Sequence, residues 1–319
     1  MSARSPAHEA FLREAEARLW RSLGVEPVER RLRLARLGTA VRIQQVGDGP
    51  PVLFLHGGST WGTSWADLAA NMPGVTCLLL DRPGTGLSEP LRDPVTDLAG
   101  LEALGAVLVP DVLDALGIDR APLVATSFGG FFAFRAAVAQ PARVERIVEL
   151  GWAAGAPVPR LPVLMRAGTA PIVGDLLARL PATNATVRGI FRGIGLGAAL
   201  DEHRVSDEAI EAYRALLTHT DTLRNDLTLG RLFLSPVRGA DPRILLGGEA
   251  RARIGLPVDL IWGEADPFGG PEVARAFAAS LPRATLVVLP GMGHAPWMDA
   301  PAAVASLVAQ RLAGEVVLS

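Results

Sequence analysis

Three residues in this chain have the types that hydrolytic chemistry requires, and each lies just beyond a short apolar run. Ser127 follows "APLVAT", Asp266 lies beyond "LPVDLIW" and His294 lies beyond "ATLVVLP". A serine hydroxyl is a weak nucleophile until a base such as histidine takes its proton, and a third group can orient that base. These residue types predict nucleophilic catalysis if the fold brings them together.

The stretch "ATSFGGFF" (125–132) has the features of a strand-to-helix turn that carries a nucleophile. The strained backbone of such a turn brings strand and helix almost into contact, so small residues are needed two positions before and after the serine. Ala125 and Gly129 meet that demand, although glycine is usual at the first position. The helix that follows would also offer the N–H of Phe128 to a developing oxyanion.

Two other candidate residues stand at strand ends. The sequence "HGGS" (56–59) follows a buried run, and its glycines allow backbone N–H groups to face a ligand. His56 is expected to hydrogen-bond within this loop rather than to act as a base. Asp81, which begins "DRPGTGLSEP", is expected to support a tight turn.

The carboxylate partner of the histidine has rivals. Pro267 biases Asp266 away from helical backbone and favours a loop position for it. Glu264 is the nearest alternative, and Glu149, at the end of an earlier run, is a more distant one. Asp266 is the preferred residue because its place in the turn is better.

The elements that must position these residues alternate along the chain. Short apolar runs separated by helical stretches are typical of an α/β fold, in which a mostly parallel sheet is flanked by helices. Ligand sites in such sheets lie beyond the carboxyl ends of the strands, where the candidate residues are found. The expected strands cover residues 51–55, 75–80, 121–126, 144–150, 256–262 and 284–290.

Flanking segments complete the expected organisation. Residues 7–23 have the spacing of an amphipathic helix docked on the core, and two antiparallel strands around Gly38-Thr39 would form a sheet edge. A long stretch that breaks the alternation has helical segments near 160–180, 185–199, 206–219 and 221–234. The expected division is an arm with a first strand (1–37), core (38–153), helical lid (154–238) and core (239–319).

Composition excludes several classes of function. The net charge is −2, which offers no basic surface for nucleic acid. All 31 basic residues of the Lys and Arg types are arginine, which excludes a lysine Schiff base and a P-loop. Cys77 is the only cysteine, so neither an intrachain disulfide nor a cysteine-rich metal site can form.

We expect no cofactor and no metal, since the histidines are not clustered and His203 and His219 read as surface residues. No signal-peptide pattern opens the chain, and no apolar run reaches the roughly 18 residues of a membrane span. These features predict a cytoplasmic protein without a membrane partner.

The motifs together resemble the α/β-hydrolase superfamily, in particular its lid-bearing, single-domain bacterial members. The resemblance extends over about residues 38–319 and is carried by "LHGG", "DRPGTGLS", "TSFGG", "WGEADP" and "GMGHAPW". The order Ser127, Asp266, His294 is also that of the superfamily. The resemblance implies a catalytic triad, an oxyanion hole formed by the N–H groups of Gly58 and Phe128, and an acyl-enzyme that water hydrolyses.

The resemblance also narrows the substrate. We expect a carboxylic ester hydrolase (EC 3.1.1 class) acting on a small apolar ester or lactone between lid and core. Alternatives are a carbon–carbon bond hydrolase, and a low-turnover binding protein, receptor or cyclase on the same scaffold. The predicted pocket residues are Ser59, Trp61, Trp152, Phe268 and Trp297.

Differences between this chain and related branches of the superfamily bear on the choice among these hydrolase types. A serine nucleophile argues against dehalogenases and epoxide hydrolases of similar fold. Proline iminopeptidases usually continue the first motif as H-G-G-P-G, whereas this chain has "HGGSTWG". Carbon–carbon bond hydrolases usually carry tryptophan directly after the histidine, whereas Ala295 follows His294 here.

Overall fold

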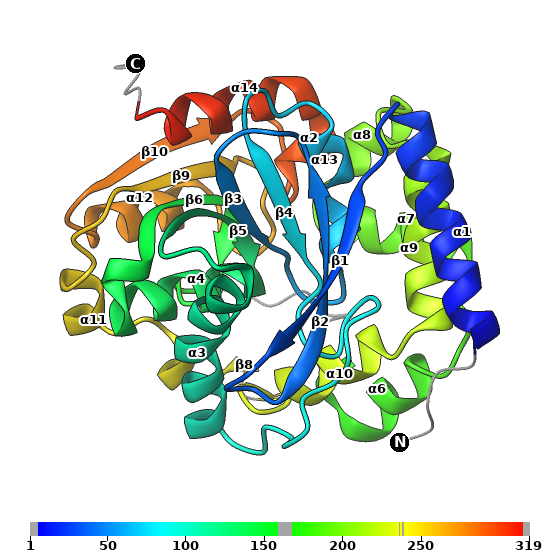
Figure 1. Cartoon of the computed structure of the whole chain (residues 1–319), viewed down its shortest axis with the longest axis horizontal. Coiled ribbons are helices and arrows are strands. Elements are labelled where there is room, and N and C mark those ends of the chain that lie inside the picture. The colour runs from blue at the N-terminus through cyan, green and yellow to red at the C-terminus, as the bar shows by residue number, and fades with distance from the viewer. Residues whose placement is uncertain (1–5, 159–167, 236, 238, 315–319) are drawn as a thin grey trace.

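An eight-stranded sheet forms the centre of the computed structural model, which describes residues 6–158, 168–235, 237 and 239–314 (Figure 1). The strand order is β1-β2-β4-β3-β5-β6-β9-β10. The pairs β1–β2 and β2–β4 are antiparallel, and all later pairs are parallel. The strands are β1 Val28–Leu34, β2 Thr39–Val46, β3 Pro51–Leu55, β4 Thr76–Leu80, β5 Ala121–Ser127, β6 Val144–Ala153, β9 Val258–Gly263 and β10 Ala284–Leu289.

The structure confirms the expected mostly parallel sheet and the antiparallel edge around Gly38. Strands β4 and β9 are buried along their whole length. Such strands cannot alternate apolar and polar residues, which is why they appear in the sequence as continuous apolar runs. Because β5 and β9 both run parallel to β6, the residues that follow them emerge at one edge of the sheet.

Helices cover both faces of the sheet, and each face has its own apolar core. Among the described helices, none is both long and apolar enough to cross a membrane. One core includes side chains of α3 (Leu98–Leu116), α4 (Phe128–Ala139) and α12 (Pro271–Ala279). The other includes side chains of α2 (Ala66–Ala69), α13 (Pro296–Asp299) and α14 (Pro301–Leu312).

Short elements connect these layers. They are the 3-10 turns η1 (Gly62–Trp65), η2 (Pro141–Arg143) and η3 (Pro242–Ile244), helix α11 (Gly248–Ala252), and the two-stranded sheet of β7 (Leu234–Ser235) and β8 (Gly239–Ala240). Cys77 is buried in β4, as expected for a small core residue.

An inserted helical segment lies between β6 and β7. Its helices are α6 (Pro171–Leu177), α7 (Asn184–Gly193), α8 (Gly197–Asp201), α9 (Asp207–His219) and α10 (Thr222–Gly230). The helix expected over 185–199 is divided into α7 and α8, because the turn between them places Gly195 at φ 91°. Part of the helix expected near 160–180 falls outside the described residues. The assignment of 154–238 as a lid stays a prediction.

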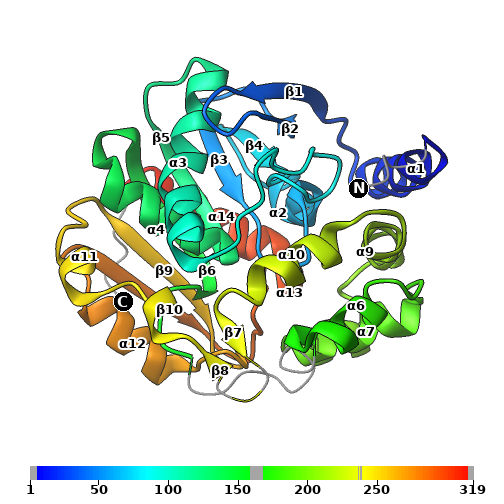
Figure 2. The ribbon, with the colours of Figure 1, turned by 90° about the horizontal axis from the view of Figure 1, so that it is seen from below.

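The N-terminal helix α1 (Pro6–Ser22) packs against α9 of the inserted segment (Figure 2). The helix also docks on the core, as expected, because its buried side chains share a cluster with residues of β2 and β3. Its apolar side chains Leu12 and Leu19 share one buried cluster with α9. The rings of His219 in α9 and Phe11 in α1 stack with their centres 4.8 Å apart. His219, expected at the surface, is consequently half-buried, whereas His203 is exposed as expected.

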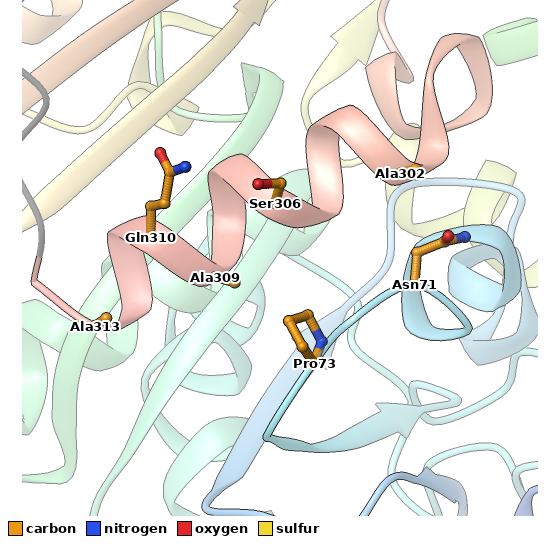
Figure 3. Close-up of a pocket in the computed structure, with 7 residues that line it drawn as sticks. All are labelled: Asn71, Pro73, Ala302, Ser306, Ala309, Gln310 and Ala313. Carbon is orange, nitrogen blue, oxygen red and sulfur yellow. The ribbon is translucent and has the colours of Figure 1, made fainter.

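A shallow hollow lies on the surface between α14 and the chain after α2 (Figure 3). It is lined by Asn71, Pro73, Ala302, Ser306, Ala309, Gln310 and Ala313. The hollow contains none of the residues that the sequence predicts for catalysis or substrate binding.

Candidate active site

The predicted nucleophile Ser127 is the last residue of β5 and immediately precedes α4. Its backbone has φ 54° and ψ −120°, a conformation that residues with a side chain rarely adopt. A Cβ added to Gly129 would lie 1.9 Å from the carbonyl oxygen of Leu55, so only glycine fits there. Ala125 is completely buried, which shows that a methyl group is accommodated on the strand side. The sharp turn expected from "ATSFGG" is therefore present.

His294 and Asp266 are in direct contact. The Nδ1 atom of His294 lies 2.8 Å from Oδ2 of Asp266, and both side chains are almost completely buried. The carboxylate also accepts the backbone N–H groups of Trp152 at 2.8 Å and Phe268 at 3.0 Å. With Nδ1 as the donor to this carboxylate, Nε2 is the nitrogen left to act as a base.

The end of β6 joins this pair to the nucleophile. The N–H of Ala154 donates to the carbonyl oxygen of Ser127 at 2.9 Å. A Cβ added to Gly151 would lie 3.2 Å from Nδ1 of His294, so the histidine loop rests directly on the backbone of β6. The residues that follow β5, β9 and β10 thus lie at one edge of the sheet, where β6 contacts both the nucleophile turn and the histidine loop.

The rival carboxylates are placed elsewhere. The Oε2 atom of Glu264 accepts the N–H of Gly291 at 2.9 Å, and its side chain is exposed. Glu149 is completely buried against the first turn of α4. The carboxylate that bonds the ring of His294 is therefore Asp266.

The loop that carries the predicted oxyanion donor lies beside the nucleophile. A Cβ added to Gly57 would be 3.2 Å from Cβ and 3.7 Å from Oγ of Ser127, while the corresponding position at Gly58 is open space. His56 is fully buried, and its ring bonds the carbonyl of Gly57 and the hydroxyl of Thr85. Burial lowers the pKa of His56 well below its ordinary value, so the ring is neutral, in line with the expected loop role.

Asp81 supports this loop, as expected for a turn residue. Its Oδ1 atom accepts the N–H of Gly62 at 2.7 Å, and Oδ2 accepts the N–H of Leu87 at 2.8 Å. Oδ2 also accepts Nε of Arg42 at 2.8 Å. The carboxylate thereby fixes the relative positions of the two loops that follow β3 and β4.

A buried ion pair ties the inserted segment to residues 56–59, the loop that carries the predicted oxyanion donor, and sequence reasoning missed it. Asp226 of α10 lies 3.0 Å from Nη2 of Arg82, and the same nitrogen donates to the carbonyl of Gly57 at 2.8 Å. Asp226 also accepts the N–H of Ser59 at 2.5 Å. No local pattern signals this pair, because its members are 144 residues apart.

Ser59 bonds Asp226 through its backbone, and the four aromatic residues predicted for the pocket fall into two groups. The ring centres of Trp152 and Phe268 are 5.6 Å apart, and those of Phe268 and His294 are 4.5 Å apart. These two aromatic residues therefore lie on the side of the predicted base. Trp61 and Trp297 are engaged in the interior instead. Nε1 of Trp61 donates to Glu16 at 2.5 Å, and Nε1 of Trp297 donates to the carbonyl of Ser64 at 3.0 Å. These contacts leave no indole N–H for a substrate.

Residues 50–301 match the model of a family described as alpha/beta hydrolase fold. A curated relative from Cupriavidus pinatubonensis, a 2-hydroxy-6-oxononadienedioate/2-hydroxy-6-oxononatrienedioate hydrolase, is 27% identical over 79% of this chain and 83% of its own length.

Two solved structures are similar in fold. The naproxen esterase of Bacillus subtilis has a TM-score of 0.74 at 19% identity, covering 97% of this chain and 99% of its own. The 2-hydroxy-6-oxo-6-phenylhexa-2,4-dienoate hydrolase of Rhodococcus has a TM-score of 0.70 at 18% identity, covering 91% and 99%.

Proposed function

Because this chain belongs to the alpha/beta hydrolase family, we propose that it is a serine hydrolase in which Ser127, His294 and Asp266 form the catalytic triad. The observation that carries the proposal is the strained backbone of Ser127 at a strand-to-helix turn, at the same sheet edge as a buried histidine–carboxylate pair. A structural serine has no need of that conformation, which the surrounding glycines must accommodate.

The proposed reaction begins when Nε2 of His294 takes the proton of the Ser127 hydroxyl as its oxygen attacks a substrate carbonyl. Asp266 holds the imidazole in the required tautomer and stabilises the imidazolium that forms. The N–H groups of Gly58 and Phe128 receive the oxyanion, and each such donor is worth about 3 kcal/mol. Collapse returns the proton to the leaving group, and water then hydrolyses the acyl-enzyme.

For the bond that is cleaved, we propose a carbon–carbon bond next to a ketone. The support is the curated relative, whose name gives a hydrolase of a 2-hydroxy-6-oxo dienoic acid. In such a substrate the leaving carbon is conjugated to a second carbonyl group, so the charge it carries is delocalised before it takes the proton from His294. The chemistry at Ser127 is then the same as for an ester, and only the leaving group differs.

Ester hydrolysis is the second candidate, and the surroundings of the oxyanion loop favour it. The relative's substrate is a dioate, which needs cationic partners, yet Arg82 beside this loop is already paired with Asp226. The rings next to His294, those of Phe268 and Trp152, suit an uncharged apolar group. Ala295 instead of tryptophan after His294 points the same way.

A fluorophosphonate probe tests the nucleophile. Wild-type protein should be labelled at Ser127, and Ser127→Ala should lose labelling together with at least about a thousandfold of any turnover. Peptide mapping of the labelled protein checks the site. Ser88→Ala is the matched control. Ser88 also follows a strand, β4, but it is buried and its hydroxyl donates to the carbonyl of Asp81. Labelling that persists in Ser127→Ala would overturn the proposal.

A comparison of two classes of substrate tests which bond is cleaved. The purified protein is given 2-hydroxy-6-oxo-6-phenylhexa-2,4-dienoate and, separately, nitrophenyl esters of graded chain length. Loss of the dienoate chromophore with kcat/KM well above that for the esters supports carbon–carbon cleavage. The reverse order supports the ester candidate. A ligand that binds tightly in calorimetry and is recovered unchanged would instead favour a binding protein.

A further inference from the structure

A buried carboxyl lies behind the predicted nucleophile, and the proposed reaction does not use it. Glu149 is in β6 and stands opposite Ala125 of β5, two residues before Ser127. Its side chain is completely buried, and neither carboxyl oxygen has a hydrogen-bond partner of good geometry. A buried polar group without a partner is costly, so its presence calls for a physical reason.

The carboxyl presses against the helix that begins at the nucleophile. A Cβ added to Gly130, in the first turn of α4, would lie 2.6 Å from Oε1 and 2.8 Å from Oε2 of Glu149. This first turn includes Phe128, the predicted oxyanion donor. The side chain of Glu149 therefore packs against the same helical turn that carries the N–H of Phe128.

Few charged groups face Glu149 from the elements around it. Strand β5 and the first turn of α4 contain none. The only charged residue of α4, Arg135, bonds Glu102 and the carbonyl of Ile244, and the only one of β9, Asp259, bonds Arg146 and Thr285. Within its own strand, Glu145 pairs with Arg120 and Arg146 with Asp259.

Burial therefore determines the protonation state. It raises the pKa of Glu149 well above its ordinary value, and the nearby backbone N–H of Ser127 opposes this shift only in part. This direction of the pKa shift favours the uncharged carboxylic acid over the carboxylate.

We propose that Glu149 is a positioning residue whose uncharged carboxyl supports the turn of Ser127 and keeps negative charge away from the oxyanion hole. The inference rests on the proposed function of Ser127. A carboxylate at this place would compete with the oxyanion for the positive end of α4 and would repel it in a region that is buried from solvent. Ionisation of Glu149 at alkaline pH should consequently lower the rate of acylation.

The test is the pH dependence of acylation in variants of Glu149. Glu149→Gln keeps the shape of the side chain and its lack of charge. The acylation rate of this variant should therefore stay within about threefold of the wild-type rate near neutral pH. Its rate should remain high where that of wild type falls at alkaline pH. Glu149→Ala, which leaves the turn unsupported, should lose tenfold or more in kcat near neutral pH with a smaller change in KM. The rate at which a fluorophosphonate labels Ser127 is a second measure of acylation.

Glu145→Gln is the control, since Glu145 belongs to the same strand but is half-exposed and pairs with Arg120. Its pH profile should match that of wild type. Two results overturn the inference. One is a folded Glu149→Gln protein that keeps the alkaline fall of wild type. The other is a folded Glu149→Gln protein that loses a hundredfold or more near neutral pH, which would mean that the carboxyl must ionise or give up its proton.

An infrared measurement on the unchanged protein keeps the inference falsifiable if the variants do not fold. A protonated carboxyl has a C=O band distinct from that of a carboxylate, and the band of Glu149 should persist near neutral pH and shift in deuterated water. Absence of any such band would overturn the inference. If wild type neither turns over a substrate nor reacts with the probe, the proposed function fails, while the infrared result still decides the state of Glu149.

Discussion

Two buried carboxyl groups in this molecule have opposite surroundings. Glu16 of the N-terminal helix accepts both Nη atoms of Arg42, Nε1 of Trp61 and the hydroxyl of Thr63, at distances between 2.5 and 2.8 Å. Glu149, behind the predicted nucleophile, has no hydrogen bond of good geometry to either oxygen. Both side chains are almost or completely buried, at 3% and 0% exposure. Burial alone therefore does not decide whether a carboxyl is charged.

The partners decide it, and they give the two groups opposite dependences on pH. Burial would raise the pKa of Glu16, but the charge of Arg42 and the hydrogen bonds outweigh it, so the pKa lies below its ordinary value. Glu16 thus adds stability near neutral pH that is lost as the pH falls. The pKa of Glu149 is raised, so its contribution is greatest at low pH and is lost as the pH rises.

Removing the partnered carboxylate should have the largest effect. Glu16→Ala should lower the free energy of unfolding by about 3–5 kcal/mol, because Arg42 loses half of its ion pairs in the interior and Trp61 loses its acceptor. Urea unfolding near neutral pH measures the loss. The difference from wild type should shrink as the pH is lowered, because the stability due to the depressed pKa of Glu16 is lost there.

Glu14→Ala is the matched control on the same helix. Glu14 is exposed and lies 3.7 Å from Arg21, a surface ion pair that contributes under about 1 kcal/mol. An equal loss of stability in both variants would show that helix propensity, rather than the buried cluster, explains the effect of Glu16→Ala.

A substitution that crowds the carboxyl of Glu149 should have an intermediate effect on the free energy of unfolding. Gly130→Ala places a methyl group against the buried Glu149 side chain and should cost about 1–3 kcal/mol, although alanine is the better helix former. In a Glu149→Ala background the same substitution should cost much less, and the double-mutant cycle measures the coupling. Gly189→Ala in α7, where an added Cβ meets nothing within 4 Å, should be neutral or stabilising. No coupling between positions 130 and 149 would contradict the packing described here.

The smallest effect should come from Asp67 of α2, whose carboxyl is only partly exposed. Burial raises the pKa of Asp67 to about 6, so the native state holds its proton more tightly than the unfolded chain. The stability that this proton provides is present below about pH 4 and is lost as the pH rises towards 6. Asp67→Asn should therefore raise the unfolding free energy near neutral pH by about 1–2 kcal/mol, after allowance for solvent screening.

Thermal unfolding across this pH range provides the measurement, with Asp93→Asn as the control because the Asp93 side chain is 92% exposed. The Asp67→Asn and wild-type curves should converge at low pH. A constant offset at every pH would show that lost packing, and not a proton, is responsible.

Local patterns allowed much of the fold to be predicted. Each apolar run became a strand within a few residues of its expected bounds, because strands covered on both faces of a parallel sheet are mostly apolar. The contact between His294 and Asp266 was also predictable, since both residues follow strands that end at the same sheet edge. The small residues around Ser127 indicated its turn for a purely steric reason.

Contacts between distant segments could not be predicted in this way. Arg82 and Asp226 stand in a turn and a helix whose local patterns are ordinary, and only the folded chain brings them together. Trp61 and Trp297 looked like pocket residues because they follow strands, yet their neighbours Glu16 and Ser64 hold them in the interior. The assignment of residues 154–238 as a lid and the roles of the site residues stay predictions.

The packing of α1 against α9 sets an order of events during synthesis. Residues 6–22 leave the ribosome long before their partner helix at 207–219, which lies about 185 residues further along the chain. An early segment thus completes its packing late, because its long-range contacts wait for α9. The loop that Glu16 holds through Trp61 and Thr63 receives the support of a fully packed α1 only after that point.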